Sequence, residues 1–134
     1  MNTPRISLVL IIFIISFSSS TSRAAELPEP KLIAVKFHAD WCGSCKKMGT
    51  VFTDLRNKFD GQPILFMTLD RTNMSTRNQS DLLISALGYD SIFEKYQGTG
   101  FILLIEPRSN QVLKKLTSTQ SIKEMAKEIA GSVS

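Results

Sequence analysis

The feature that most constrains the fold is the point where an apolar, β-type run meets a pair of cysteines. Residues 31–38 (KLIAVKFH) are rich in β-branched and aromatic side chains, which predicts a mostly buried strand. Cys42 and Cys45, the only cysteines of the chain, follow directly. Beyond them the apolar spacing becomes helical, and a single stripe predicts one helix over residues 42–59. That stripe consists of Met48, Val51, Phe52, Leu55 and Phe59.

The remainder of the chain predicts an α/β fold with a central mixed four-stranded sheet flanked by helices. Three further strands are expected at residues 64–69, 101–106 and 111–116, the first of them buried. A polar loop is expected at residues 70–79, followed by helices at 81–87, with Ser80 as N-cap, and at 91–96. Turns are expected at residues 98–100 and 107–110. Ser121 and Glu124 form a capping-box pattern that predicts a last helix ending near Gly131.

The N-terminus predicts a secretory signal peptide over residues 1–24. A positively charged start precedes an uncharged apolar run at residues 6–17. As a helix, this run would span roughly 18 Å, which is too short for a hydrocarbon core of about 30 Å. Cleavage after Ala24 places small residues at positions −3 and −1. We therefore expect residues 25–134 to form one domain; an uncleaved anchor or a core helix is the alternative.

The charge of the chain gives little support to nucleic-acid binding. The formal net charge is +4, but two of the basic residues, Arg5 and Arg23, lie in the predicted signal peptide. The mature chain then carries about two net positive charges. It has no arginine-rich run and no stripe in which aromatic and basic residues alternate.

The spacing of Cys42 and Cys45 favours redox chemistry over a structural role. A disulfide between them closes a very small ring, and the stabilisation from a disulfide grows with loop length. A helix that begins here places Cys42 at the N-cap and Cys45 at N3. The free amide hydrogens and the helix dipole then favour the Cys42 thiolate, so this residue is expected to have a lowered pKa and to be the nucleophile. Cys45, three residues later, lies within reach to resolve a mixed disulfide.

Other readings of the cysteine pair are a metal site and an inert thiol pair. Zinc sites use the same spacing, but structural zinc normally needs four ligands, and the chain has two cysteines and one histidine, His38. His38 could pack in the core, tune the thiolate or act as a third soft ligand. Gly43 would let a partner backbone approach, and Trp41 would lie beside the sulfurs as a flat, partly exposed apolar surface.

The sequence around the cysteines resembles the thioredoxin-fold family of thiol–disulfide oxidoreductases. Residues 35–46 (VKFHADWCGSCK) are similar to the family's strand followed by A-x-W-C-x-x-C-K. Residues 96–104 (YQGTGFILL) are similar to the segment that carries the family's cis-proline before a strand. The resemblance covers about residues 31–131. It implies a thioredoxin-like fold in which Cys42 attacks and Cys45 resolves, with Trp41 at the usual tryptophan position.

Three positions depart from the family pattern. Gly100 replaces the cis-proline, whose preceding backbone, here Thr99, meets the bound peptide; we expect a trans peptide bond and a more open substrate groove. Lys36 replaces the buried acid that accepts a proton from the resolving thiol. Lys36 could stabilise thiolates, extend toward solvent or pair with an acid. Ser44 makes the intervening dipeptide Gly-Ser instead of Gly-Pro, and such dipeptides help to set the reduction potential.

The leading functional hypothesis is an exported thiol–disulfide oxidoreductase. The expected partners are exported proteins with cysteines or disulfides and an electron donor or acceptor, with no nucleic acid. Membrane contact is expected only through the signal peptide. The mature protein is expected to be a monomer in the periplasm or outside the cell. No cofactor and no metal is expected, because the Cys42–Cys45 dithiol carries the two electrons. The alternatives are a Cu(I) chaperone that uses both cysteines, with or without His38, and a redox-inactive binding domain.

Overall fold

The structure is a computed structural model that describes residues 28–133. The predicted signal peptide and its cleavage point lie outside these residues. Within them, no helix is both long enough and apolar enough to cross a membrane.

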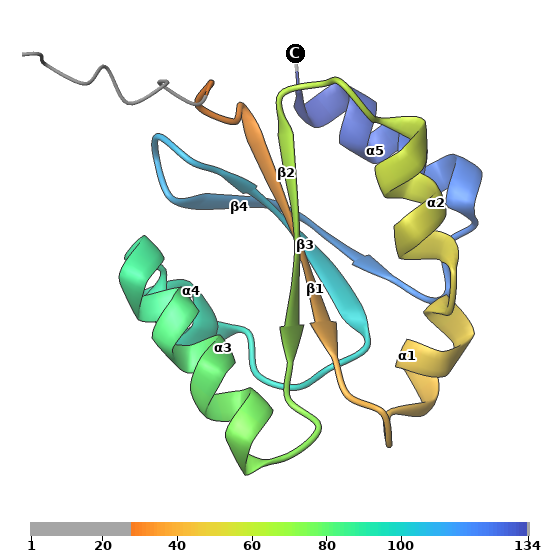
Figure 1. The fold of residues 1–134 in the computed structure, drawn as a ribbon. Coiled ribbons are helices and arrows are strands. Elements are labelled where there is room, and N and C mark those ends of the chain that lie inside the picture. The colour runs from red at the N-terminus through yellow and green to blue at the C-terminus, as the bar shows by residue number, and fades with distance from the viewer. Residues whose placement is uncertain (1–27, 134) are drawn as a thin grey trace, which may run out of the picture.

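The described chain folds into a four-stranded mixed sheet covered by helices on both faces, as predicted (Figure 1). Strands β1 (Leu32–His38) and β2 (Ile64–Asp70) are parallel, whereas β3 (Phe101–Glu106) is antiparallel to both β1 and β4 (Gln111–Thr117). The order across the sheet is β2-β1-β3-β4, so β1 and β3 are the central strands. Both are buried along most of their length because they are covered on both faces.

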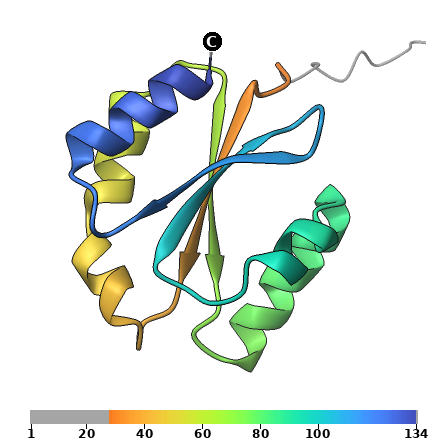
Figure 2. The ribbon, with the colours of Figure 1, turned by 180° about the vertical axis from the view of Figure 1, so that it is seen from behind.

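Five helices form the two outer layers. Helices α1 (Gly43–Met48), α2 (Val51–Lys58) and α5 (Ile122–Ser132) cover one face of the sheet, and α3 (Met74–Leu87) and α4 (Asp90–Lys95) cover the other (Figures 1 and 2). Alternate side chains of β1 enter the two cores. Leu32 and Ala34 pack with the α1–α2–α5 layer, and Ile33, Val35 and Phe37 pack with the α3–α4 layer.

Two predicted helices are confirmed almost to the residue. Ser121 and Glu124 form the predicted capping box, with Ser121 Oγ accepting the backbone N–H of Glu124 at 3.3 Å. The short helix predicted at residues 91–96 is α4. The predicted stripe on residues 42–59 also packs into the core.

The single helix predicted over residues 42–59 is wrong in one respect, because it is broken into α1 and α2. Gly49 lies between them with φ +33°, and its N–H donates to the carbonyl of Cys45 at 3.0 Å. This backbone ends α1 and turns the chain before Val51. The predicted apolar stripe is nevertheless correct, because the second helix still directs Phe52 and Leu55 into the core.

The polar loop predicted at residues 70–79 is also wrong, since α3 begins at Met74. Asn73 caps the helix by accepting the N–H of Thr76 at 3.1 Å, and Thr76 reciprocates toward Asn73. Ser80, predicted as the cap, is instead buried within the helix and donates to the carbonyl of Asp70 at 2.8 Å. The strand predicted as buried at residues 64–69 is the edge strand β2, and its Leu65 is 41% exposed.

Candidate functional site

The two cysteines lie at the start of α1, at the end of the sheet where the parallel strands β1 and β2 terminate (Figure 1). Cys42 is the N-cap, with extended backbone angles, and Cys45 is at N3, as predicted. The N–H of Cys45 donates to Cys42 Sγ at 3.2 Å. A turn in which the N–H of Cys42 donates to the carbonyl of Ala39 at 3.1 Å brings the chain from the strand into this position. Both cysteines are free thiols in the structure.

The environment of Cys42 favours its thiolate. Burial alone would raise the pKa of this thiol, but hydrogen bonds from the Cys45 and Thr99 side chains and from the Cys45 and Ser44 backbone outweigh burial, so the pKa is lowered. The two backbone donors, Ser44 and Cys45, are among the unpaired N–H groups at the start of α1. The lowered pKa that the sequence predicts for Cys42 is therefore supported by the geometry.

Cys45 has the opposite character. It is only 2% exposed, and burial, followed by the interaction with Cys42, raises the pKa of its thiol. Its Sγ donates to the carbonyl of Phe37 at 3.6 Å, and the backbone of Ala39 forms a further hydrogen bond with it. The pair therefore combines an outer sulfur that ionises readily with an inner sulfur that holds its proton.

Gly100 lies directly against the cysteine loop. Its N–H donates to the carbonyl of Phe37 at 2.8 Å, its φ is +88°, and no peptide bond in residues 28–133 is cis, as expected for a glycine here. A Cβ at this position would lie 2.6 Å from Ser44 Cβ and 3.2 Å from Cys42 Sγ. The Gly100 backbone therefore lies close to the cysteine loop, and a more open substrate groove at this position stays a prediction. Thr99 is also at the site, since its side chain interacts with both cysteines.

Trp41 provides the exposed apolar surface that was predicted beside the cysteines. Its side chain is 62% exposed, and its indole N–H donates to the carbonyl of Thr72 at 3.0 Å. Thr72 also accepts the N–H of Asp40 through its hydroxyl at 3.0 Å. Sequence reasoning missed Thr72, because nothing local marks a threonine in the β2–α3 connection as a support for the cysteine loop. Gly43 is open to solvent, and a Cβ there would contact nothing within 4 Å.

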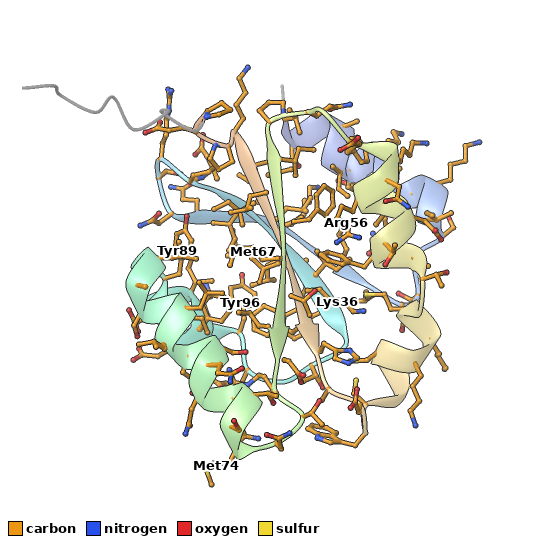
Figure 3. All side chains as sticks on the ribbon, in the orientation of Figure 1. Lys36, Arg56, Met67, Met74, Tyr89 and Tyr96 are labelled. Atoms are coloured by element: carbon orange, nitrogen blue, oxygen red, sulfur yellow. The ribbon has the colours of Figure 1, made fainter. Side chains whose placement is uncertain are left out.

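Lys36 lies on the face of β1 that is covered by α1 and α2 (Figure 3). Its Nζ is 5.7 Å from the centre of the Phe52 ring, and among the described residues it forms no ion pair. Of the alternatives for this residue, pairing with an acid is therefore not observed. The side chain is half-buried, and its charge lies in the layer that also holds Cys45.

His38 is at the last position of β1 and is partly buried. Its Nε2 lies 3.0 Å from Asp40 Oδ1, and its register partner on β2 is Asp70. The pKa of Asp70 is lowered, first by a hydrogen bond from the Thr72 hydroxyl and to a smaller extent by His38. Asp40 and Asp70 were not predicted as site residues. The position of Asp70 at the end of a strand beside β1 is the signal that could have identified it.

The structure offers no cluster for a metal ion within the part of the chain that it describes. No group of three or more His, Cys, Asp or Glu side chains there is arranged to hold one. In particular, His38 does not join Cys42 and Cys45 as a third ligand.

Comparisons with known proteins agree with this geometry. The family model for thioredoxin matches residues 16–87, more than half of the chain. The thioredoxin of Ictalurus punctatus is 36% identical over 55 residues, which are 41% of this chain and 48% of that protein. Protein disulfide-isomerase 1 of Caenorhabditis elegans is 40% identical over 47 residues, which are 34% of this chain and 10% of that protein. The chain thus matches about half the length of the first relative and a small part of the second.

Solved structures support the fold. A mutant thioredoxin from Halobacterium salinarum superimposes with a TM-score of 0.51 at 17% identity, over 78% of this chain and 77% of that one. The mixed four-stranded sheet with helices on both faces is therefore a thioredoxin-like fold, as the sequence predicted. With the match of the family model over residues 16–87, the conclusion is that this chain belongs to the thioredoxin family.

Proposed function

We propose that this protein is a thiol–disulfide oxidoreductase whose active dithiol is Cys42-Gly43-Ser44-Cys45. The observation that carries the proposal is the position of Cys42 Sγ, which accepts the N–H of Cys45 at the start of α1 and has a lowered pKa. The thiolate, not the thiol, attacks a disulfide. The thioredoxin and protein disulfide-isomerase relatives support the same class of reaction.

The reaction proceeds in two exchanges. The Cys42 thiolate attacks one sulfur of a client disulfide, forms a mixed disulfide and releases the other client sulfur as a thiolate. Cys45 then loses its proton and attacks Cys42 Sγ, so that the Cys42–Cys45 disulfide forms and the second client thiolate leaves. Two electrons pass from the dithiol to the client, and the reverse sequence oxidises a client dithiol. No cofactor is needed, because the two sulfurs carry the electrons.

The exposed surface around Cys42 suits a protein client. Trp41 is largely exposed beside it, and Gly43 leaves room for an approaching backbone. Thr99 and Gly100 also lie close to the Cys42 sulfur. We propose that clients are exported proteins with cysteines or disulfides, and that a separate electron donor or acceptor regenerates the monomeric protein.

Export is proposed from the sequence of residues 1–24, with the mature protein in the periplasm or outside the cell. Expression of the full chain in a host with an outer membrane, followed by fractionation and N-terminal sequencing, tests this. We expect a periplasmic protein that begins at Ala25. A full-length protein that retains Met1 in the cytosol would contradict export without affecting the proposed chemistry.

The activity is tested by insulin reduction with wild type, Cys42→Ser and Cys45→Ser. We expect turnover in wild type only, and Cys45→Ser should accumulate mixed disulfides with insulin through Cys42. Because the pKa of Cys42 is lowered, alkylation of the reduced protein by iodoacetamide should stay fast as the pH falls below about 8.5, where a free cysteine becomes protonated. The rate should fall only when the pH passes the lower pKa of Cys42. An alkylation midpoint at or above that of free cysteine would contradict the proposal.

A further inference from the structure

The second exchange of the proposed reaction poses a problem of proton transfer. Cys45 must be deprotonated to attack Cys42, yet it is 2% exposed and burial raises the pKa of its thiol. Bulk water has little access to this sulfur, so a protein group has to accept the proton. The inference below rests on the proposed function and assigns that group.

Most ionisable side chains near Cys45 cannot accept a proton. Lys36, on the same face of β1, is a cation with no lone pair to offer. Asp40 is 77% exposed at its side chain and bonds to His38 instead. Asp70, on β2, has a pKa lowered by hydrogen bonds from Thr72, so its carboxylate is a weak base. On α1, Lys46 and Lys47 are exposed to solvent.

His38 has the geometry that the others lack. Its neighbours on both sides contact Cys45, through the carbonyl of Phe37 at 3.6 Å from Sγ and through the backbone of Ala39. Strand alternation places the His38 side chain on the same face of β1 as Ala34, which is the face covered by α1 and its buried Cys45. The imidazole therefore lies on the side of the strand where the thiol is held.

The hydrogen bonds of His38 leave one nitrogen free to act as a base. Asp40 Oδ1, an acceptor, lies 3.0 Å from Nε2, so Nε2 carries the hydrogen in the neutral ring. Nδ1 then has a lone pair. This atom is buried and has no hydrogen-bond partner among the described residues. A buried, unpaired acceptor is costly, and a role in proton transfer accounts for it. An imidazole that a carboxylate orients is also the usual form of a base beside a thiol.

We propose that His38 Nδ1 accepts the proton of Cys45 as the mixed disulfide is resolved. The Cys45 S–H bond breaks, the proton moves to Nδ1, and the sulfur attacks Cys42 Sγ with its electron pair. The bond between Cys42 and the client sulfur breaks, and the client leaves as a thiolate. Asp40 stabilises the imidazolium, which then returns its proton to the leaving thiolate or to solvent.

The test uses the aromatic disulfide DTNB, which releases one coloured thiolate in each exchange. With excess DTNB under stopped flow, the first release reports attack by Cys42 and the second, unimolecular release reports attack by Cys45. In His38→Gln we expect the second phase to slow by about ten- to a hundredfold at pH 7, with the first phase within about twofold of wild type. Asp40→Asn should also slow the second phase, because the imidazolium loses its stabilising carboxylate.

A second measurement does not depend on a variant that must fold. His38 is the only histidine in the chain, so ¹⁵N NMR of the reduced wild type reports its tautomer without ambiguity. We expect the neutral ring to carry its hydrogen on Nε2. A hydrogen on Nδ1, or a second phase in folded His38→Gln that is as fast as in wild type, would overturn the assignment. If wild type itself releases no second thiolate, the proposed function fails together with this inference; if it does and His38→Gln is unchanged, only the inference fails.

Discussion

At the residue scale, Gly100 is the most unusual feature of the site. The family places a cis-proline there, whose φ near −65° cannot fit a backbone at +88°. Gly100 instead uses a trans bond, donates its N–H to Phe37, and brings its Cα against Ser44 and Cys42. Because residue 100 has no side chain, its backbone can lie beside Cys42 Sγ.

This contact predicts the behaviour of an alanine at Gly100. The variant Gly100→Ala combines backbone strain from the positive φ with a clash, since its Cβ would lie 2.6 Å from Ser44 Cβ. Gly98→Ala is the matched control, because Gly98 also has a positive φ but a Cβ there meets nothing within 4 Å. We expect Gly98→Ala to lower the free energy of unfolding by about 1 kcal/mol and Gly100→Ala by about 2–4 kcal/mol. Urea unfolding measures both free energies. Equal decreases in the two variants would show that Ser44 moves away from the new Cβ at no energetic cost.

Sequence reasoning named the residues that carry the proposed chemistry but not the residues that support them. Cys42, Cys45 and Trp41 are marked by their own types and spacing, and the structure places them as a strand-to-helix junction requires. Thr72 is brought to the loop only by the folded chain, through hydrogen bonds from Trp41 and Asp40. The close approach of Gly100 depends on backbone angles that no local pattern of residues indicates.

At the element scale, helix starts were predicted where a local side-chain pattern marks them and were missed where none does. The α5 start was found because Ser121 and Glu124 form a side-chain pattern of the common type. The α3 start was missed because its reciprocal cap is Asn73 with Thr76, in a stretch that is polar on every side. The break at Gly49 was missed because the apolar stripe continues on both sides of it. Such a stripe indicates which side chains are buried but does not indicate where the backbone turns.

The break between α1 and α2 gives a prediction whose sign is informative. If residues 42–59 formed one helix, Gly49→Ala would stabilise it by about 1 kcal/mol, since alanine is the better helix former. In the structure Gly49 has φ +33°, and a Cβ would lie 3.2 Å from the carbonyl oxygen of Lys46. We therefore expect Gly49→Ala to lower the free energy of unfolding by about 1–2 kcal/mol. Thermal unfolding of the reduced protein measures this. A higher melting temperature in the variant would contradict the observed break.

At the scale of the whole molecule, the site joins parts that are far apart in the chain. Strand β1 delivers Lys36 and His38, helix α1 holds the cysteines, and the connection before β3 supplies Thr99 and Gly100. The fold brings these segments together at one end of the sheet. The charges around the cysteine loop therefore depend on the sheet as well as on the local motif, and Lys36 is the cation that β1 contributes.

The ammonium group of Lys36 should make the dithiol a stronger oxidant. It lies over Phe52 in the layer beneath α1, with no ion-pair partner among the described residues. A positive charge there favours thiolates and so stabilises the reduced protein, which raises the reduction potential. We expect a potential above the roughly −270 mV of thioredoxin. An interaction on the order of 1 kcal/mol at an effective dielectric constant near 20 corresponds to about 20 mV.

The variant Lys36→Met separates this charge from the rest of the site. We expect its reduction potential to be about 20 mV more negative than that of wild type. Lys58→Met, which removes an exposed charge at the far end of α2, is the control and should leave the potential unchanged. Equilibration in glutathione or dithiothreitol buffers, followed through the fluorescence of the single tryptophan, Trp41, gives all three values. Two results would contradict the prediction: a wild-type potential as low as that of thioredoxin, or equal potentials for the two variants. Either result would show that the charge of Lys36 does not affect the cysteines and that its observed contact is with the Phe52 ring alone.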